Sequence, residues 1–203
     1  MAGRPRGVDD EVILRAAADV IGRVGPAKLT LSLVAREVGL VPGTLVQRFG
    51  SKRGLLLAVA EHSVKDPEAV LRQVRDGHVS ALAAVEALVT RQMAGMATPE
   101  VFANHLAFLC IDLTDPEFHE HALAVHRAQG QAIESLLAEA VSAGELRAGT
   151  DVAALAATVQ AIAAGAGLTW ALERAGALDE RLRKEIRGVL APHVPATPDL
   201  EEA

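Results

Sequence analysis

Residues 30–49 read TLSLVAREVGLVPGTLVQRF, and this stretch decides the fold. Thr30 carries a hydroxyl that can cap a helix over residues 31–38, and Gly39 permits the positive φ of a sharp turn. Pro42 suits the first position of a second short helix. Two short helices joined by a turn of three or four residues that contains Gly are typical of a helix-turn-helix.

The second short helix has a polar face and an apolar face. At 100° per residue, Thr44, Gln47 and Arg48 share an arc of about 100°, while Leu45 and Phe49 lie together on a neighbouring arc. Side chains of these three polar types hydrogen-bond base edges in the major groove; Gln suits adenine and Arg suits guanine. The pattern therefore favours an apolar face that packs and a polar face that reads DNA.

Lys52 and Arg53 lie in the first turn of the helix that follows. The helix dipole disfavours cations there, typically by about 0.3 to 1 kcal/mol. A bound phosphate would remove this conflict. Side chains that simply extend into solvent are the alternative explanation.

Helical patterns also cover the rest of the chain. Residues 9–24 form an amphipathic helix that Gly25 and Pro26 are expected to end. Further helices are expected over residues 55–65, 67–75, 79–96, 99–113, 116–143, 152–175 and 178–191.

Composition supports an all-α fold. Of the 203 residues, 50% are hydrophobic and only 2% aromatic, so Ala, Leu and Val must build the interior, and these favour helices when strand-forming aromatics are scarce. We expect a three-helix head that contains the helix-turn-helix over residues 1–53 and a larger helical body over 54–191. Residues 192–203, with three prolines and three acids, are expected to form a flexible tail.

Charge is divided unevenly between these parts. Residues 1–53 hold nine Lys or Arg and five Asp or Glu, a net charge of +4, although the whole chain carries −6. The remainder therefore carries −10. Attraction to phosphate depends on the field within about 8 to 10 Å, so an acidic protein with a basic head can bind a polyanion.

The sequence also indicates a compartment. The one cysteine, Cys110, permits no intramolecular disulfide, and the N-terminus lacks the apolar stretch of a signal peptide. We expect a cytoplasmic protein. The segment 152–172 is apolar enough to suggest a membrane span, but it is rich in Ala and Gly and lacks flanking belts, so a buried helix and no membrane contact are expected.

The first 60 residues resemble the TetR family of bacterial transcriptional regulators. The matching residues are Ile13-Leu14-Arg15-Ala16-Ala17, Gly25, Leu29-Thr30-Leu31, Val34-Ala35-Arg36-Glu37-Val38-Gly39-Leu40, Gly43-Thr44-Leu45, Arg48-Phe49, Ser51-Lys52 and Leu55-Leu56. A weaker similarity covers residues 143–146 and Asp151, before an Ala-rich helix. The resemblance implies a repressor that binds palindromic double-stranded operator DNA as a homodimer and is released by a small-molecule effector.

The resemblance also implies DNA contacts for particular residues. Residues that match phosphate-contacting or base-contacting positions of the family are Thr30, Thr44, Arg48 and Lys52. Gln47 joins them because it lies on the same arc as Thr44 and Arg48. Arg4 and Arg6 can form an arm that enters the minor groove, with a solvated tail as the alternative.

Three residues depart from the family pattern. Val46 replaces a tyrosine whose hydroxyl would bind phosphate, and Leu33 replaces a commonly polar residue. Val41 replaces a small hydroxyl residue, which removes a helix cap worth about 1 kcal/mol. Together these changes imply weaker phosphate anchoring.

The expected body has candidate effector residues and a candidate dimer interface. Larger or polar-tipped side chains on its helices, each alternatively explained as ordinary core, are Met93, Met96, Phe102, His105, Phe108 and Trp170. They predict a small hydrophobic effector that receives one hydrogen bond from His105. Ala153, Ala157, Ala161 and Gly165 follow at four-residue steps, which suits close approach of a second helix, either in a dimer or inside one chain.

Nothing in the sequence indicates an enzyme, a metal site or a bound cofactor. His119 and His121 are two residues apart, so they point to different helix faces, and Glu117 with His121 makes only two ligands. Cys110 lies in an apolar run, which predicts a buried, inert thiol. Two alternatives to the effector-responsive repressor remain: a helical adaptor that binds proteins, and a DNA-binding protein without an effector.

Overall fold

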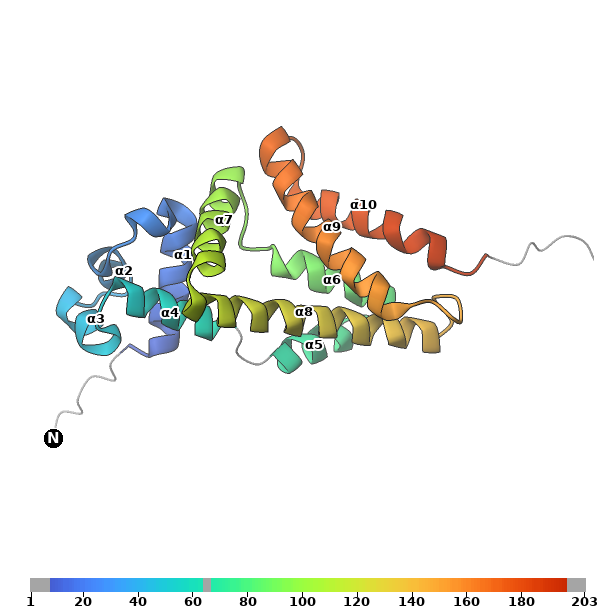
Figure 1. Cartoon of the computed structure of the whole chain (residues 1–203), viewed down its shortest axis with the longest axis horizontal. Helices are drawn as coiled ribbons and strands as arrows, with labels where there is room; N and C mark the ends of the chain where they lie inside the picture. The colour runs from blue at the N-terminus through green and yellow to red at the C-terminus, as the bar shows by residue number, and fades with distance from the viewer. Residues whose placement is uncertain (1–7, 64–66, 197–203) are drawn as a thin grey trace, which may run out of the picture. The chain divides into compact units, whose positions relative to one another are not determined.

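The computed structural model describes residues 8–63 and 67–196 (Figure 1). These residues contain ten α-helices, one 3-10 helix and no strand, which confirms the all-α prediction. The helices are α1 (Asp10–Lys28), α2 (Leu31–Glu37), α3 (Pro42–Phe49), α4 (Lys52–His62), α5 (Pro67–Asp76), α6 (Ala81–Gln92), α7 (Pro99–Thr114), α8 (Pro116–Ser142), α9 (Val152–Glu173) and α10 (Leu178–Leu190), followed by the 3-10 helix Ala191–His193.

The chain divides into two compact units. The described residues within 1–65 and 95–126 form the first unit, and those within 66–94 and 127–203 form the second. The first unit therefore contains α4, α7 and the start of α8 in addition to the three helices expected in the head.

Helix α1 continues past the point where the sequence predicts its end. Gly25 has φ 79° and ψ 160°, which breaks the helical path, but the chain re-enters a helical turn at Pro26 and ends at Lys28. An added Cβ at Gly25 would come within 2.9 Å of the Asn104 side chain. The predicted breaker is therefore a kink, and proline is tolerated because it begins a new turn.

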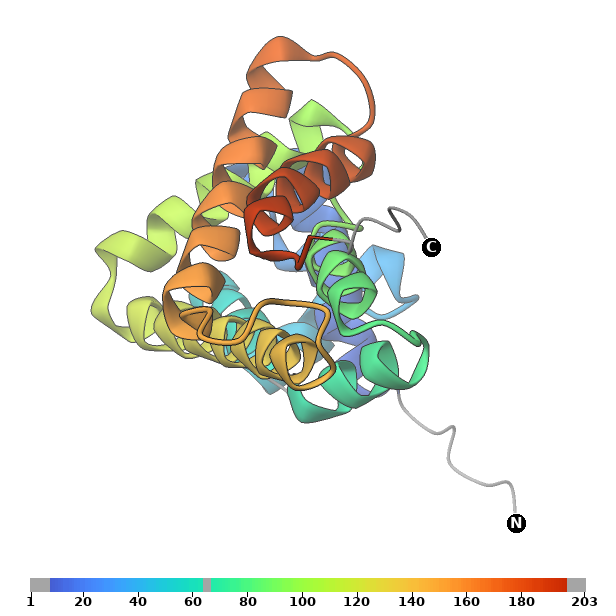
Figure 2. The same ribbon diagram turned by 90° about the vertical axis from the view of Figure 1, so that its right-hand side faces the viewer.

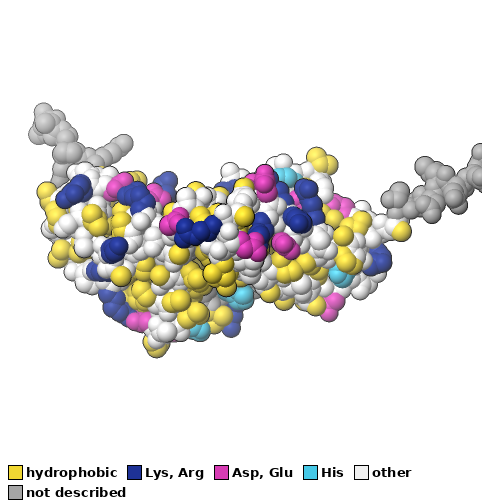
Figure 3. Space-filling view, turned by 90° about the horizontal axis from the view of Figure 1, so that it is seen from above, with side chains coloured by type: hydrophobic (Ala, Val, Ile, Leu, Met, Phe, Trp, Pro, Cys, Tyr) yellow, Lys and Arg dark blue, Asp and Glu magenta, His cyan; other side chains and the backbone are white. Residues whose placement is uncertain are grey.

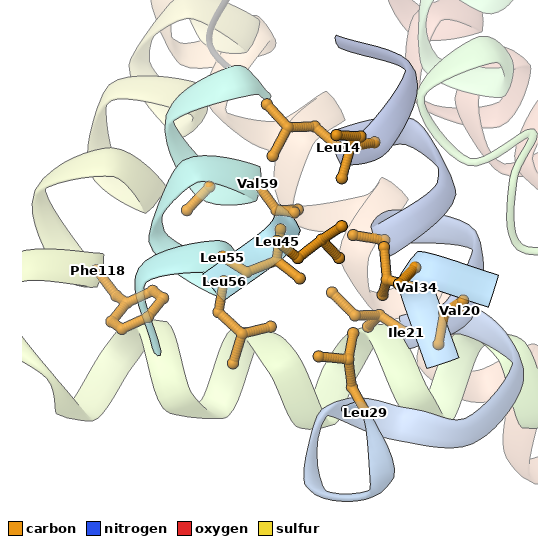
Figure 4. Packing of buried hydrophobic residues seen from close by; sticks show 14 residues of the cluster. Leu14, Val20, Ile21, Leu29, Val34, Leu45, Leu55, Leu56, Val59 and Phe118 are labelled. Carbon is orange, nitrogen blue, oxygen red and sulfur yellow. The ribbon is translucent and has the colours of Figure 1, made fainter. Parts of the chain in front are cut away.

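The core of the first unit joins α1 to α4 with the start of α8. Leu45 of α3 is fully buried and packs among side chains of α1 and α4, as the close view shows (Figure 4). The fully buried members of this cluster are Ile13, Ala17, Leu29, Val34, Ala35, Leu45 and Leu55. Phe118 of α8 joins the cluster beside α4. This packing fixes the orientation of α3.

Helix α7 packs along α1 within the same unit. The Asn104 Nδ2 atom donates to the carbonyl oxygen of Gly22 at 2.7 Å. A Cβ added to Gly22 would lie 3.2 Å from His105 Nε2, so the glycine allows the two helices to approach closely. Asn104 and His105 of α7 therefore both face α1.

In the second unit, Glu145 holds the first turn of α6. Its carboxylate accepts hydrogen bonds from the backbone N–H groups of Ala81 (2.8 Å) and Leu82 (3.1 Å) and from the Ser80 hydroxyl (2.6 Å). Burial alone would raise the pKa of Glu145, but these hydrogen bonds outweigh burial and leave the pKa below its usual value. The turn after α8 thus caps a helix that begins 64 residues earlier.

Helices α9 and α10 lie side by side in both ribbon views (Figures 1 and 2). The apolar row predicted on α10 is buried and consists of Leu178, Leu182, Ile186 and Leu190. Trp170 of α9 is also buried, and its Nε1 donates to the Gly176 carbonyl at 3.0 Å. These contacts close the hairpin formed by the two helices.

Helix α9 is less buried than its sequence predicts. By length and composition, it is the one described helix that could cross a membrane, and 33% of its most apolar window is buried. One face, with Leu155, Val159 and Ala163, is buried, whereas Leu168 and Leu172 are exposed. The expectation of a buried helix therefore holds for only one side of α9.

The beginning of the expected flexible tail is ordered. Residues 191–193 form the 3-10 helix, and the Arg147 backbone N–H donates to the His193 carbonyl at 2.8 Å. The Arg147 guanidinium also donates to the Pro192 carbonyl. Residues 191–193 are therefore held by contacts with Arg147, and a flexible tail over 192–203 stays a prediction for the residues beyond them.

Candidate functional site

The turn between α2 and α3 has the geometry of a helix-turn-helix. Thr30 caps α2, because its hydroxyl accepts a hydrogen bond from the Leu33 N–H at 3.2 Å. Gly39 has φ 68°, and Pro42 is the first residue of α3. Val41 precedes α3 without making a side-chain cap. Local sequence signals therefore set both helix ends as predicted.

Helix α3 presents a polar face outward. Leu45 is fully buried, whereas Gln47 is exposed and Thr44 is half-buried. Val46 stands where the TetR family, which this sequence resembles, usually has a tyrosine, and it is 49% exposed. The face beside Leu45 is therefore open to a partner, and its side chains include amide and hydroxyl groups that can hydrogen-bond.

Arg48 is not a free side chain on this face. Its Nη1 atom donates to the Val8 carbonyl at 2.6 Å and to Asp10 Oδ1 at 2.9 Å. The side chain is 29% exposed. Arg48 therefore links α3 to the start of α1, a contact between residues 38 apart that the sequence pattern does not reveal.

Lys52 is also committed to an internal contact. Its Nζ donates to the Ala27 carbonyl at 2.8 Å. Ala27 lies in the last turn of α1, three residues before Thr30, so this bond brings Lys52 to the connection at which α2 begins. The ammonium has further donors, because Lys carries three N–H bonds. Lys52 thus remains able to contact a phosphate while it holds the α1 end.

Arg53 finds its partners within the first unit. The guanidinium donates to Glu117 at 2.6 Å and to both oxygens of Asp115 at 2.8 and 3.0 Å, and it lies 5.3 Å from the centre of the Phe118 ring. The hydrogen bonds to Glu117 and Asp115 raise the pKa of Arg53. The two carboxylates therefore offset the repulsion between the Arg53 cation and the positive end of the α4 dipole, and no bound phosphate is needed for this.

Arg4 and Arg6, the candidates for a minor-groove arm, lie outside the described residues. Of the other DNA-contact candidates, Gln47 and Thr44 share the open face of α3, and Lys52 lies near the start of α2. All belong to the first unit. Sequence reasoning missed the acceptors of Arg48, Lys52 and Arg53, because each comes from a distant segment of the chain.

The six candidate effector residues are divided between the two units. Phe102, His105, Phe108 and Met96 belong to the first unit, whereas Met93 and Trp170 belong to the second. Phe108 packs edge-on against Phe118 with ring centres 6.2 Å apart. Burial lowers the pKa of His105, partly offset by the charge of Asp19. His105 thus faces α1, and its contact with an effector stays a prediction.

The prediction for Cys110 is wrong. Its thiol is exposed, because the buried positions of α7 are Phe102 and Asp112 instead. Glu117, proposed at most as one of two metal ligands, is paired with Arg53. Within the described parts of the chain, no three His, Cys, Asp or Glu side chains are grouped as metal ligands would be.

Comparison with known proteins supplies the family. A family model described as "Bacterial regulatory proteins, tetR family" matches residues 13–59, and one described as "Tetracyclin repressor-like, C-terminal domain" matches residues 81–186. No curated protein matches the sequence.

Several solved structures share the fold. A TetR transcription regulator from Haloarcula marismortui has a TM-score of 0.75 at 14% identity and covers 92% of this chain and 98% of its own. SmeT, the repressor of the Stenotrophomonas maltophilia multidrug efflux pump SmeDEF, has a TM-score of 0.66 at 20% identity and covers 97% of each chain. The transcriptional regulator FadR from Bacillus subtilis, in complex with stearoyl-CoA, has a TM-score of 0.65 at 16% identity and covers 90% and 98%.

Proposed function

Because this chain belongs to the TetR family of bacterial regulatory proteins, we propose that it is a repressor that binds a near-palindromic operator as a homodimer and leaves it when a small hydrophobic effector binds. Members of this family regulate transcription and are not enzymes. The observation that carries the proposal is the open polar face of α3, fixed in orientation by the burial of Leu45. A regulator of bacterial genes acts in the cytoplasm, where the DNA is.

In the proposed complex, α3 lies in the major groove. Gln47 and Thr44 contact base edges, because they lie on the open face and have groups that pair with bases. Thr30 and Lys52 contact phosphates from the start of α2 and of α4. Arg4 and Arg6 precede α1 and reach the adjacent minor groove.

In this complex Arg48 both contacts DNA and holds α3 beside α1. Its bonds to Val8 and Asp10 are exposed enough to exchange for contacts with DNA, since a surface ion pair typically contributes at most about 1 kcal/mol. We propose that the guanidinium exchanges Asp10 for DNA while it keeps α3 beside α1.

The exposed side of α9 supports the homodimer. Ala153, Ala157, Ala161 and Gly165 are all exposed and follow one another along one stripe. The stripe carries no charge, so a second copy can approach closely without burying an unpaired ion. Because the apolar row of α10 is already buried against its own unit, we propose α9 as the centre of the interface.

The proposed effector is small and largely hydrophobic. Relatives include FadR in complex with stearoyl-CoA and SmeT in complex with triclosan. The candidate residues for this chain remain the six named above. All six lie in the proposed body, residues 54–191, and we propose that effector binding there changes how the DNA-binding head, residues 1–53, meets the operator.

The function is tested with the DNA upstream of the protein's own coding region in a competition gel shift at fixed salt. We expect retention of this DNA in the presence of excess nonspecific DNA. Gln47→Ala should weaken operator binding by about 1–3 kcal/mol and relax the sequence preference. Lys52→Ala should weaken binding to all sequences and make the slope of log affinity against log salt concentration shallower by about 1. Arg48→Ala should abolish specific binding.

The matched control is Lys184→Ala, an exposed cation on α10, which should leave affinity unchanged. Thermal unfolding of Arg48→Ala and Lys52→Ala separates lost DNA contacts from lost internal bonds. Equal affinity for upstream and nonspecific DNA, with a steep salt dependence, would contradict the operator proposal.

A further inference from the structure

A groove of about 550 Å³ lies between α6 and α10 in the second unit. Its volume is within the range of about 300 to 1,000 Å³ that small-molecule sites occupy. None of the six candidate effector residues lines it. The lining residues are His78, Ala83, Glu86, Ala87, Thr90, Arg91, Ala94, Asp179 and Arg183.

An ion pair fixes how the two walls of the groove face each other. Arg187 of α10 donates from Nε and Nη2 to the carboxylate of Glu86 on α6, at 2.8 to 3.0 Å. The helices run antiparallel (Figure 1). One turn further along α6 therefore corresponds to one turn back along α10, which places Arg91 and Arg183 at the same level of the groove.

The floor of the groove is apolar and long. Ala83 and Ala87 lie one turn apart on the same face of α6, and Ala94 continues the apolar lining two residues after the helix ends. The Thr90 hydroxyl lies between them, but it already donates to the Glu86 carbonyl at 2.6 Å. This strip therefore offers contact area to an apolar body and no free hydrogen-bond donor.

The two arginines retain binding capacity. Among the residues that the structure describes, no ion pair engages Arg91. Arg183 pairs only with Asp179 of its own helix, at 3.2 Å, and both side chains are about half exposed. Such a pair typically contributes about 0.3–0.5 kcal/mol, so a ligand can replace it. Glu86 is already neutralised by Arg187 and repels an anion less than a free acid would.

From this geometry we infer that the groove binds an elongated amphipathic carboxylate. Its apolar body lies along the alanine strip, and its carboxylate lies between the Arg91 and Arg183 guanidiniums, whose planar donors match carboxylate oxygens in pairs. The site goes beyond the proposed repressor function, because it uses neither the DNA-binding face nor the candidate effector residues.

The test uses dodecanoate as the probe and the full-length protein without DNA, in isothermal titration below the probe's micelle concentration. We expect saturable binding of one dodecanoate per chain, with dodecanol at least tenfold weaker. Arg91→Gln and Arg183→Gln should each weaken dodecanoate binding at least tenfold and leave dodecanol binding unchanged. Lys184→Gln, which removes an exposed cation of α10 outside the groove, should change neither affinity by more than about twofold.

A second variant tests the floor. Ala87→Leu fills the strip beneath the apolar body and should weaken both probes, whereas Ala138→Leu, at an exposed position of α8, should weaken neither. Circular dichroism confirms that each variant is helical. Equal affinities of dodecanoate and dodecanol, or dodecanoate binding that survives both arginine substitutions, would overturn the proposal. A loss of operator binding in the gel shift described above would leave it intact, since this titration contains no DNA.

Discussion

Asp112 of α7 is the one buried charged residue among those that the structure describes, with 8% of its surface exposed. Its Oδ1 atom has no hydrogen-bond partner in the described part of the chain. Burial raises the pKa of Asp112 to about 6, and the charge of His121 only partly opposes this rise. A buried carboxylate without full hydrogen bonding costs stability when it is ionised.

The sign of the pH effect follows from this shift. An unfolded Asp has a pKa of about 3.9, so the folded chain binds an extra proton between about pH 4 and pH 6. This residue therefore favours folding at acid pH, and its contribution is lost as the pH rises through about 6. Asp112→Asn should raise the free energy of unfolding at pH 7 by about 1–3 kcal/mol, with a much smaller gain at pH 4.5.

Urea unfolding at the two pH values measures this difference. Asp76→Asn, at an exposed position, is the control and should change stability by less than about 0.5 kcal/mol at either pH. If Asp112→Asn raised the free energy of unfolding equally at both pH values, or lowered it at pH 7, ionisation of the buried carboxylate would not be what destabilises the folded chain.

Gly54 at the start of α4 is required by close packing. A Cβ added there would lie 2.0 Å from the Phe49 carbonyl oxygen, so the backbone between α3 and α4 must move. Gly54→Ala should lower the free energy of unfolding by about 1–3 kcal/mol, as overpacking does, and should weaken operator binding because α3 shifts.

Gly43→Ala is the matched control. The same atom added at Gly43 of α3 meets nothing within 4 Å, and alanine is the better helix former by about 1 kcal/mol. Thermal unfolding should therefore move in opposite directions for the two variants. A melting temperature for Gly54→Ala at or above that of the unmodified protein would contradict the packing argument.

At the scale of single elements, α3 begins without a side-chain cap. Val41 is 68% exposed and offers no acceptor to the first turn. Val41→Ser places a hydroxyl where it can accept from the Thr44 N–H, and this should stabilise the protein by about 1 kcal/mol. Chemical unfolding checks the gain; Val41→Ala, which adds no acceptor, should not reproduce it.

Sequence reasoning succeeds for elements whose ends depend on neighbouring residues. The Thr30 cap, the positive φ of Gly39 and the position of Pro42 are local, so the pattern shows them directly. It fails where a partner lies far along the chain: Arg48 meets Asp10, and Arg53 meets Asp115, across separations of 38 and 62 residues. Cys110 and part of α9 are exposed despite their apolar surroundings in the sequence, because an apolar run does not reveal which side of a helix is covered.

At the scale of the whole molecule, the proposed homodimer makes a direct prediction. Ala161→Glu places a charge at the centre of the exposed α9 stripe, and burying it unpaired in a dimer interface costs several kcal/mol. We expect a monomer in size-exclusion chromatography with light scattering at micromolar concentration, and loss of operator binding with it.

Ala138→Glu makes the same change at an exposed alanine of α8 and should leave the dimer intact. A dimeric Ala161→Glu protein would place the interface elsewhere. A monomeric unmodified protein would remove the argument for two half-sites about 34 to 36 Å apart.

The carboxylate of Glu145 has a consequence for synthesis on the ribosome. The backbone donors of Ala81 and Leu82 leave the exit tunnel long before residue 145 does, so the first turn of α6 stays open to water in the nascent chain. Translation at roughly 5–20 residues per second makes this interval several seconds. A stalled or truncated chain that stops before residue 145 would therefore expose an unfinished α6 to proteases, and only the longer product would resist digestion.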